Sequence, residues 1–184
     1  FTVPHSISCW DQDAMFRLPE GRPLKAYPEG KFYATDAITE YALDFLEEGV
    51  NKPEPFFLFL SYNAPHFPLH APKEITEKYV AEYEKGWDVI REKRAENRKE
   101  LGFDEHEINP LEPERFAPWN LSPEELVTQI DPHESGRAIP WSELTEDQQE
   151  LQATKMAIHA AMVSRMDREI GRYLEALKRL APNK

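Results

Sequence analysis

The stretch PFFLFLSYNAPHFPLHAP, residues 55–72, decides the expected fold. Its first part, Phe56–Tyr62, is an apolar run of strand length without polar alternation until its end, which is typical of a β-strand covered on both faces. The loop Asn63–Pro72 follows directly. In open α/β sheets, ligands bind just beyond the carboxyl ends of the strands. The stretch therefore predicts a buried strand that carries a functional loop.

A helical pattern precedes this stretch. Apolar residues recur at helical intervals from Ile38 to Leu46. Thr35 or Asp36 is a suitable N-cap for this helix, and Gly49 is a stop signal. A helix followed by a buried strand predicts the α/β class, with the chain forming a portion of a doubly wound, mostly parallel sheet sandwiched by helices.

The remainder of the chain is helical and loop-rich. Residues from about 85 to 144 combine helical and proline-rich segments, and we interpret them as an insertion. This insertion contains a capping box at Ser122 and Glu125. A second capping box, at Thr145 and Gln148, begins a long amphipathic helix with its apolar face at Leu151, Ile158, Met162, Ile170, Tyr173 and Leu177.

The composition excludes several classes of function. A formal net charge of -12 argues against nucleic acid as a partner, because neutralising a phosphate backbone requires clustered Lys and Arg. The sequence has no apolar run long enough for a membrane span. Cys9 is the single cysteine, which excludes an internal disulfide and a cysteine-based zinc site.

His66 is the strongest candidate for a catalytic residue. It lies between two prolines at the expected end of the strand, where a restricted backbone would orient the imidazole. A histidine there either donates a proton or a hydrogen bond to a substrate, or only bonds a carbonyl of its own loop. Asn63 is a weaker candidate for substrate binding. His70 invites a two-histidine metal site, but no acidic residue accompanies the pair in the loop, and we predict no metal ligands.

No nucleophile motif is found in the sequence. It contains no G-x-S-x-G elbow, P-loop, dinucleotide fingerprint or H-E-x-x-H. Cys9 lacks the histidine context of a catalytic thiol. Any covalent catalysis would therefore need a residue outside these 184.

Four segments together resemble the sulfatases of the alkaline-phosphatase-like superfamily, in particular their bacterial arylsulfatase-type branch. They are YATDAITEYALDFL, PFFLFLSYNAPHFPLHAP, the YEKGWD segment with its two following arginines, and KMAIHAAMVSRMDREIGRYLEAL. The resemblance implies that residues 1–184 are an internal fragment of a sulfatase catalytic domain. In such enzymes a cysteine-derived formylglycine attacks the sulfur, and Ca²⁺ helps to hold the sulfate. His66 matches the family's sulfate-contacting histidine.

The resemblance also implies what lies outside the fragment. Cys9 stands in S-C-W-D-Q and does not match the C-x-P-S-R motif of the formylglycine precursor. We therefore expect the formylglycine and the Ca²⁺ ligands outside residues 1–184, and an isolated fragment that is inactive. The expected partners are an aryl or glycan sulfate ester and the remainder of the parent catalytic domain. The expected location is periplasmic or secreted, although no signal peptide is recognisable in the fragment.

Two alternatives stay open from the sequence. One is a phosphonate monoester or phosphodiester hydrolase of the same superfamily, because a fold does not determine its substrate. The other is a non-catalytic interaction module. The residue at the nucleophile position would distinguish them.

Overall fold

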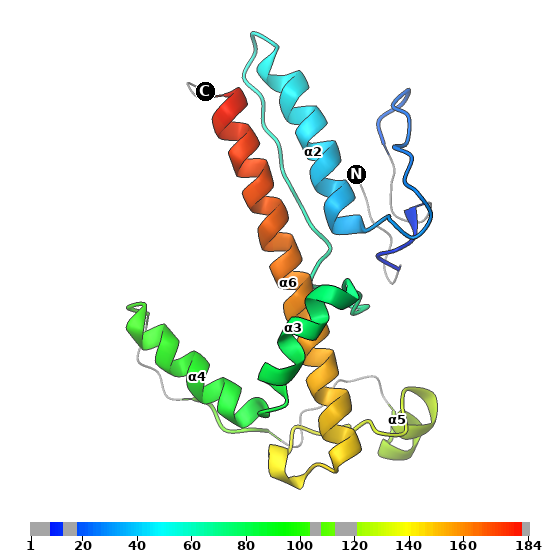
Figure 1. Ribbon diagram of the computed structural model, residues 1–184, viewed down its shortest axis with the longest axis vertical. Coiled ribbons are helices and arrows are strands. Elements are labelled where there is room, and N and C mark those ends of the chain that lie inside the picture. The colour runs from blue at the N-terminus through cyan, green and yellow to red at the C-terminus, as the bar shows by residue number, and fades with distance from the viewer. Residues whose placement is uncertain (1–7, 13–17, 104–107, 113–120, 182–184) are drawn as a thin grey trace. The chain divides into compact units, whose positions relative to one another are not determined.

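The structure is a computed structural model that describes residues 8–12, 18–103, 108–112 and 121–181. Its regular elements are helices (Figure 1): α2 (Ala34–Val50), α3 (Lys73–Tyr83), α4 (Trp87–Glu100), α5 (Pro123–Gln129), the short 3₁₀ helix η1 (Trp141–Glu143) and α6 (Glu146–Leu180). They divide into two compact units, one of Phe1–Ile75 with Ile158–Lys184 and the other of Thr76–Ala157. No helix in the described ranges combines the length and apolar character that a membrane crossing requires.

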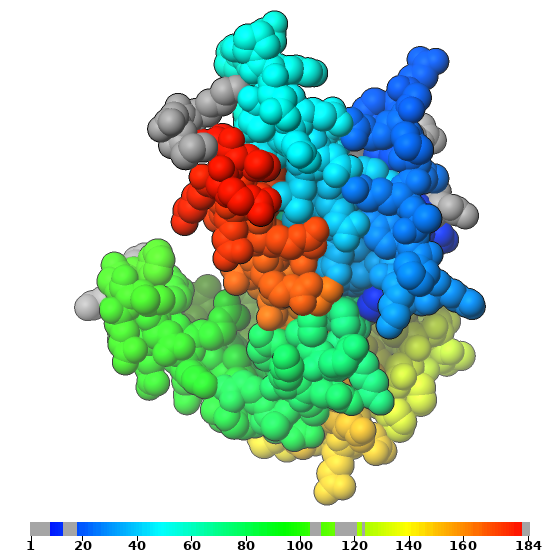
Figure 2. All heavy atoms as spheres, turned by 45° about the horizontal axis from the view of Figure 1, so that its top comes forward, coloured from blue at the N-terminus to red at the C-terminus, as the bar shows by residue number. Residues whose placement is uncertain are grey.

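The first unit is built on α2 and the part of α6 from Ile158 onward. Helix α2 has eight buried residues, among them Ile38, Tyr41 and Leu46. Met162 of α6 is fully buried, and Figure 2 shows atoms of α2 beside those of the C-terminal part of α6. Burying apolar side chains of this size contributes on the order of 2 kcal/mol each to the stability of the unit.

Both ends of α2 differ from the sequence prediction, and the predicted stop, Gly49, lies inside the helix, which ends at Val50. Tyr33 is the N-cap and makes no capping side-chain bond, so the expectation of Thr35 or Asp36 is wrong. The backbone N–H of Ala34 is instead bonded to the carbonyl of Cys9 at 2.9 Å. A distant backbone carbonyl here satisfies one of the N–H groups that a capping side chain would otherwise serve.

The expected doubly wound parallel sheet is wrong for the described residues, which form no strand. Residues 56–62 are extended and run back beside α2 (Figure 1), without a neighbouring strand. Phe57 is 90% exposed and Phe59 is 77% exposed. To form a sheet, an extended segment must bond to a neighbouring strand through its backbone N–H and C=O groups. The described part of the chain provides no such strand. The extended backbone was predicted correctly, whereas the predictions of a sheet and of a strand buried on both faces are wrong for the described residues.

A contact between two tryptophans lies at the centre of the described interactions in the second unit. The rings of Trp87 and Trp141 meet edge to face with centroids 5.0 Å apart. Gly86 has φ 89°, and a Cβ at this position would approach the Trp141 ring to 2.5 Å, so both the conformation and the space require glycine. The Asp88 carboxylate accepts the backbone N–H of Trp141 at 2.9 Å.

Both predicted capping boxes are confirmed. The Ser122 hydroxyl accepts the N–H of Glu125, whose carboxylate accepts the N–H of Ser122. Thr145 and Gln148 form the same reciprocal pair before α6. The assignment of residues from about 85 to 144 as an insertion stays a prediction.

Candidate functional site

The candidate site is the loop Asn63–Pro72, which follows the extended segment. A tight turn opens it, with the backbone N–H of His66 donating to the carbonyl of Asn63 at 2.8 Å. The Ala64–Pro65 and Phe67–Pro68 peptide bonds are both cis. Proline cannot donate a backbone hydrogen bond and has a restricted φ, so the residues on either side of His66 have little conformational freedom.

The start of the loop is attached to α2 through Tyr62. Its hydroxyl lies 2.8 Å from the hydroxyl of Thr39, which is completely buried. The Thr39 hydroxyl is also within hydrogen-bonding distance of the Thr35 carbonyl, at 3.3 Å. Burial raises the pKa of Tyr62, so its phenol stays protonated at neutral pH and able to donate.

The end of the loop is attached through His70. The backbone N–H of Cys9 donates to Nδ1 of His70 at 3.2 Å. The Tyr33 hydroxyl donates to the backbone carbonyl of His70 at 2.9 Å. Burial raises the pKa of Tyr33 to about 12, which keeps this donor protonated across the physiological range. Side chain and backbone of His70 are therefore both held.

Asn63 points toward Cys9. Its amide nitrogen lies 3.5 Å from the Cys9 sulfur, and its amide oxygen is buried without a hydrogen-bond partner. Cys9 itself is 1% exposed, and this burial raises the pKa of its thiol. The amide nitrogen thus helps to attach the loop to the turn at Cys9. Substrate binding by Asn63 stays a prediction.

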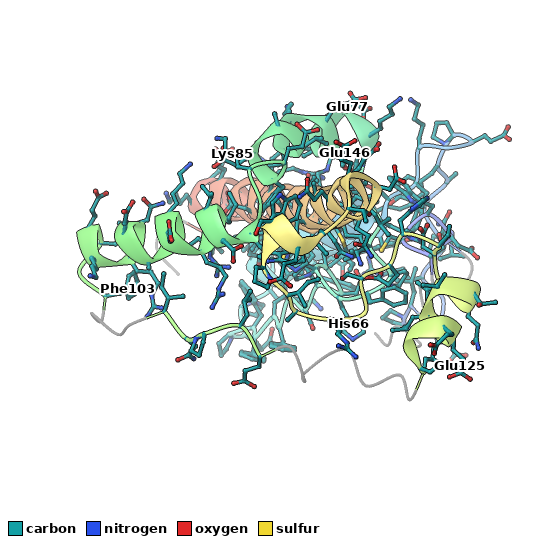
Figure 3. The ribbon with its side chains drawn as sticks, turned by 90° about the horizontal axis from the view of Figure 1, so that it is seen from below. His66, Glu77, Lys85, Phe103, Glu125 and Glu146 are labelled. Atoms are coloured by element: carbon teal, nitrogen blue, oxygen red, sulfur yellow. The ribbon has the colours of Figure 1, made fainter. Side chains whose placement is uncertain are left out.

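His66 is exposed (Figure 3), and its ring has a defined hydrogen bond. The Nδ1 atom lies 2.6 Å from the backbone carbonyl oxygen of Phe67. A carbonyl oxygen only accepts, so Nδ1 carries the hydrogen. In the neutral ring Nε2 is then an acceptor, and in the imidazolium it becomes a second donor. A catalytic role for His66 also stays a prediction at this point.

A cluster of charges joins α2 to α6 near the loop's first attachment. Arg165 donates to both carboxylate oxygens of Asp36, from Nε to Oδ1 at 2.7 Å and from Nη2 to Oδ2. Glu169 is completely buried, and its two carboxylate oxygens accept bonds from Arg168 and Arg172 at 2.9 and 2.8 Å. Such bidentate, charge-assisted bonds fix geometry as well as adding energy.

Sequence reasoning missed this cluster. Asp36 and Arg165 are 129 residues apart, and each reads as an ordinary helix-surface residue by itself. The three-residue spacing of Glu169 and Arg172 was the one available signal, since residues at that interval share a helix face.

The described residues do not form a metal site. No group of three or more His, Cys, Asp or Glu side chains suited to a metal ion occurs in the ranges that the structure describes. The two loop histidines differ in their bonding, because His66 bonds within its own loop and His70 bonds to the turn at Cys9.

Comparison with known proteins gives consistent results. The family model described as Sulfatase matches residues 8–184. An uncharacterised sulfatase of Schizosaccharomyces pombe is 33% identical over 147 residues, covering 80% of this chain and 23% of the relative. The arylsulfatase of Klebsiella aerogenes is 30% identical over 154 residues, covering 83% and 28%. The iduronate 2-sulfatase of Mus musculus is 29% identical over 147 residues, covering 79% and 23%.

The chain spans about a quarter of the length of these relatives. The family match extends over nearly the whole chain, including the loop and both of its attachments. The resemblance first noted in four separate segments is therefore confirmed, and this chain belongs to the sulfatase family.

Proposed function

We propose that residues 1–184 are an internal part of a sulfatase that hydrolyses aryl or glycan sulfate esters, and that His66 contacts the sulfate group. Membership of the sulfatase family supports the reaction class. The names of two relatives, an arylsulfatase and an iduronate 2-sulfatase, support both kinds of ester as candidates. The family also suggests an exported enzyme, and we propose a periplasmic or secreted location.

One observation carries the assignment of His66. Its imidazole is exposed on a loop that is attached at both ends, and Nδ1 is occupied by the Phe67 carbonyl. Only Nε2 is left for a substrate. A ring held in this way is oriented before the substrate arrives, and such preorganisation is what transition-state stabilisation requires.

The chemistry follows from the charge that develops during ester cleavage. When the bond between sulfur and the ester oxygen breaks, negative charge grows on that leaving oxygen and on the sulfate. With His66 in its imidazolium form, Nε2–H donates a hydrogen bond to a sulfate oxygen or transfers its proton to the leaving oxygen. Either role lowers the barrier, because a hydrogen bond or a proton stabilises the negative charge that develops on the oxygen atoms.

The nucleophile and the metal are proposed to come from outside residues 1–184. In the family, formylglycine supplies the attacking oxygen and Ca²⁺ compensates charge on the sulfate. Cys9 does not fit the first role, because its thiol is buried and contacts Asn63. The described carboxylates do not fit the second, because they form no metal-binding group. We assign no step to either in this part of the chain.

The remainder of the catalytic domain is the proposed partner of this segment. The exposed aromatic side chains of Phe57 and Phe59 support this, since two neighbouring large apolar groups are rarely left in solvent. They lie on the extended segment that leads directly into the candidate loop.

The test is the substitution His66→Ala in the full-length enzyme. We expect kcat for para-nitrophenyl sulfate to fall by roughly 10²- to 10⁴-fold. If Nε2 transfers a proton, phenyl sulfate, whose leaving group is more basic, should lose more activity than para-nitrophenyl sulfate. His66→Gln keeps a neutral N–H donor but cannot transfer a proton, so it should preserve part of the activity only if hydrogen bonding is the main role.

His159→Ala is the matched control, because His159 is an exposed histidine of the same unit on α6. It should leave kcat unchanged. Full activity in His66→Ala would contradict the assignment. Hydrolysis of a phosphonate monoester or a phosphodiester in preference to sulfate esters would indicate the other hydrolase class, and no hydrolysis of any of these esters would indicate a non-catalytic module.

A further inference from the structure

We propose that His70 is a positioning residue for His66, acting as a hydrogen-bond acceptor that attaches the end of the candidate loop to the turn at Cys9. This inference rests on the proposed role of His66. It assigns to the second histidine of the loop a task that involves neither a metal nor the substrate.

The geometry supporting this proposal has two parts. Through its side chain, His70 accepts the backbone N–H of Cys9 at 3.2 Å, which joins residues 61 positions apart. Through its main chain, it accepts the Tyr33 hydroxyl at 2.9 Å. Both donors come from well-packed residues, because Cys9 is 1% exposed and Tyr33 is 3% exposed. His70 is therefore bonded to a rigid part of the first unit.

The rigid part is itself bonded to α2. The Cys9 carbonyl accepts the N–H of Ala34, the first residue of that helix, at 2.9 Å. Cys9, Tyr33 and Ala34 also belong to one buried cluster with Phe32 and Ala37. The position of His70 is consequently set by the N-terminus of α2. The end of the loop is therefore fixed relative to that helix.

The short connection to His66 transmits this position. Only Phe67, Pro68 and Leu69 separate the two histidines. The Phe67 carbonyl holds the His66 ring, and Pro68 restricts the backbone next to it. A shift of His70 would therefore move the atom to which His66 Nδ1 is bonded. Misplacing a catalytic group by about 1 Å costs up to roughly 100-fold in rate.

The two rings have opposite protonation requirements. His70 must have a bare Nδ1 in order to accept the Cys9 N–H, whereas His66 must have a hydrogen on Nδ1 in order to donate to Phe67. This difference gives a selective substitution. The side-chain oxygen of asparagine can occupy the place of Nδ1, while the amide of glutamine reaches toward the place of Nε2. We therefore expect asparagine at position 70 to preserve the hydrogen bond from Cys9, and glutamine to lose it.

The experiment is a double-mutant cycle in the full-length enzyme with para-nitrophenyl sulfate. We expect His70→Ala to lower kcat by at least about 10-fold, His70→Asn to restore most of it, and His70→Gln to resemble alanine. In a His66→Ala background, His70→Ala should have no further effect on kcat, because its effect acts through His66. A merely structural loss would instead multiply with the loss from His66→Ala.

Tyr33→Phe tests the same attachment without touching His70. It removes only the hydroxyl that donates to the His70 carbonyl, and it should lower kcat by a few-fold while the melting temperature is recorded in parallel. Tyr27→Phe is its matched control, because the Tyr27 hydroxyl bonds to Glu40 and not to the loop. This control should retain full kcat.

The outcomes separate the two hypotheses. If His66→Ala retains activity, the proposed function fails and the role of His70 fails with it. If His66→Ala is impaired but His70→Ala is not, or if the His70→Ala effect persists unchanged in the His66→Ala background, the role of His66 stands and the positioning role of His70 is overturned. Equal activity of His70→Asn and His70→Ala would also overturn it.

Discussion

Helix α2 and the extended segment 56–62 lie close together in the sequence and both contain large apolar side chains, which are buried in the helix and exposed in the segment. Tyr41 and Leu46 of α2 are 2% and 0% exposed, whereas Phe57 and Phe59 are 90% and 77% exposed. A helix satisfies most of its backbone hydrogen bonds internally and needs only one partner for its apolar face. A strand needs neighbours for its backbone, and one with apolar side chains on both faces also needs cover on both.

The difference shows where the candidate loop obtains its support. The extended segment leads into the loop and is largely uncovered, and its described side-chain bond is the one from its last residue, Tyr62, to Thr39 of α2. The described attachments come from elsewhere: Thr39 and Tyr33 belong to α2 or its cap, and Cys9 is bonded to the start of α2. In this part of the chain, the helix rather than the strand-like segment positions the site.

The largest expected effect is on the buried face of α2. Leu46→Ala should lower the free energy of unfolding by roughly 2–5 kcal/mol, because it removes a fully buried side chain and leaves a cavity. Urea unfolding followed by circular dichroism measures this loss. Leu174→Ala is the matched control, since Leu174 is 47% exposed on α6, and equal losses in both variants would contradict the described packing.

An intermediate effect is expected for the charge pair between the two helices. Arg165→Met should cost roughly 1–3 kcal/mol in the same assay, because the largely buried Asp36 carboxylate loses two charge-assisted bonds. Adding Asp36→Asn should recover part of the loss by removing the unpaired charge. Lys85→Met, at an exposed pair with Glu82, should cause a much smaller loss, because solvent screens exposed charges. A double variant no more stable than Arg165→Met would argue against this pair.

The smallest effect is expected for the extended segment. Phe57→Ser should change the free energy of unfolding of residues 1–184 by less than about 0.5 kcal/mol, because its side chain is almost wholly exposed. Phe32→Ser, at a 7% exposed position in the first unit, should cost several times more. A loss for Phe57→Ser comparable with that for Leu46→Ala would mean that the segment is covered, and the comparison with α2 would no longer hold.

Sequence patterns predicted the positions of the helices better than the burial and the partners of their side chains. The capping boxes before α5 and α6 were recognised because their residues lie three positions apart. The long apolar face of α6 was only partly right. Met162 is buried as expected, but Ile170 is 36% exposed and Glu169 beside it is completely buried. Its two arginine partners make the burial of Glu169 possible. A pattern of apolar residues along the helix does not take such charge partners into account.

The loop was located by its sequence, but its support was not. The prolines on either side of His66 and the preceding apolar run indicated a functional loop at that position. Nothing local indicated that His70 accepts a bond from Cys9, 61 residues away, or that Tyr33 holds the same residue. The local signal in the sequence was a second histidine, which raised the idea of a metal site, although no metal ligands were predicted there.

The sequence by itself determined the family, the helical segments with their capping boxes, and the loop on which His66 lies, because each depends on residues close together along the chain. The tertiary structure alone decided which apolar segments are covered, which helix holds the loop, and which charges are paired. Those outcomes depend on contacts between distant residues, such as Asp36 and Arg165. Such contacts form only when the chain folds, and the spacing of residues along the sequence carries no information about them.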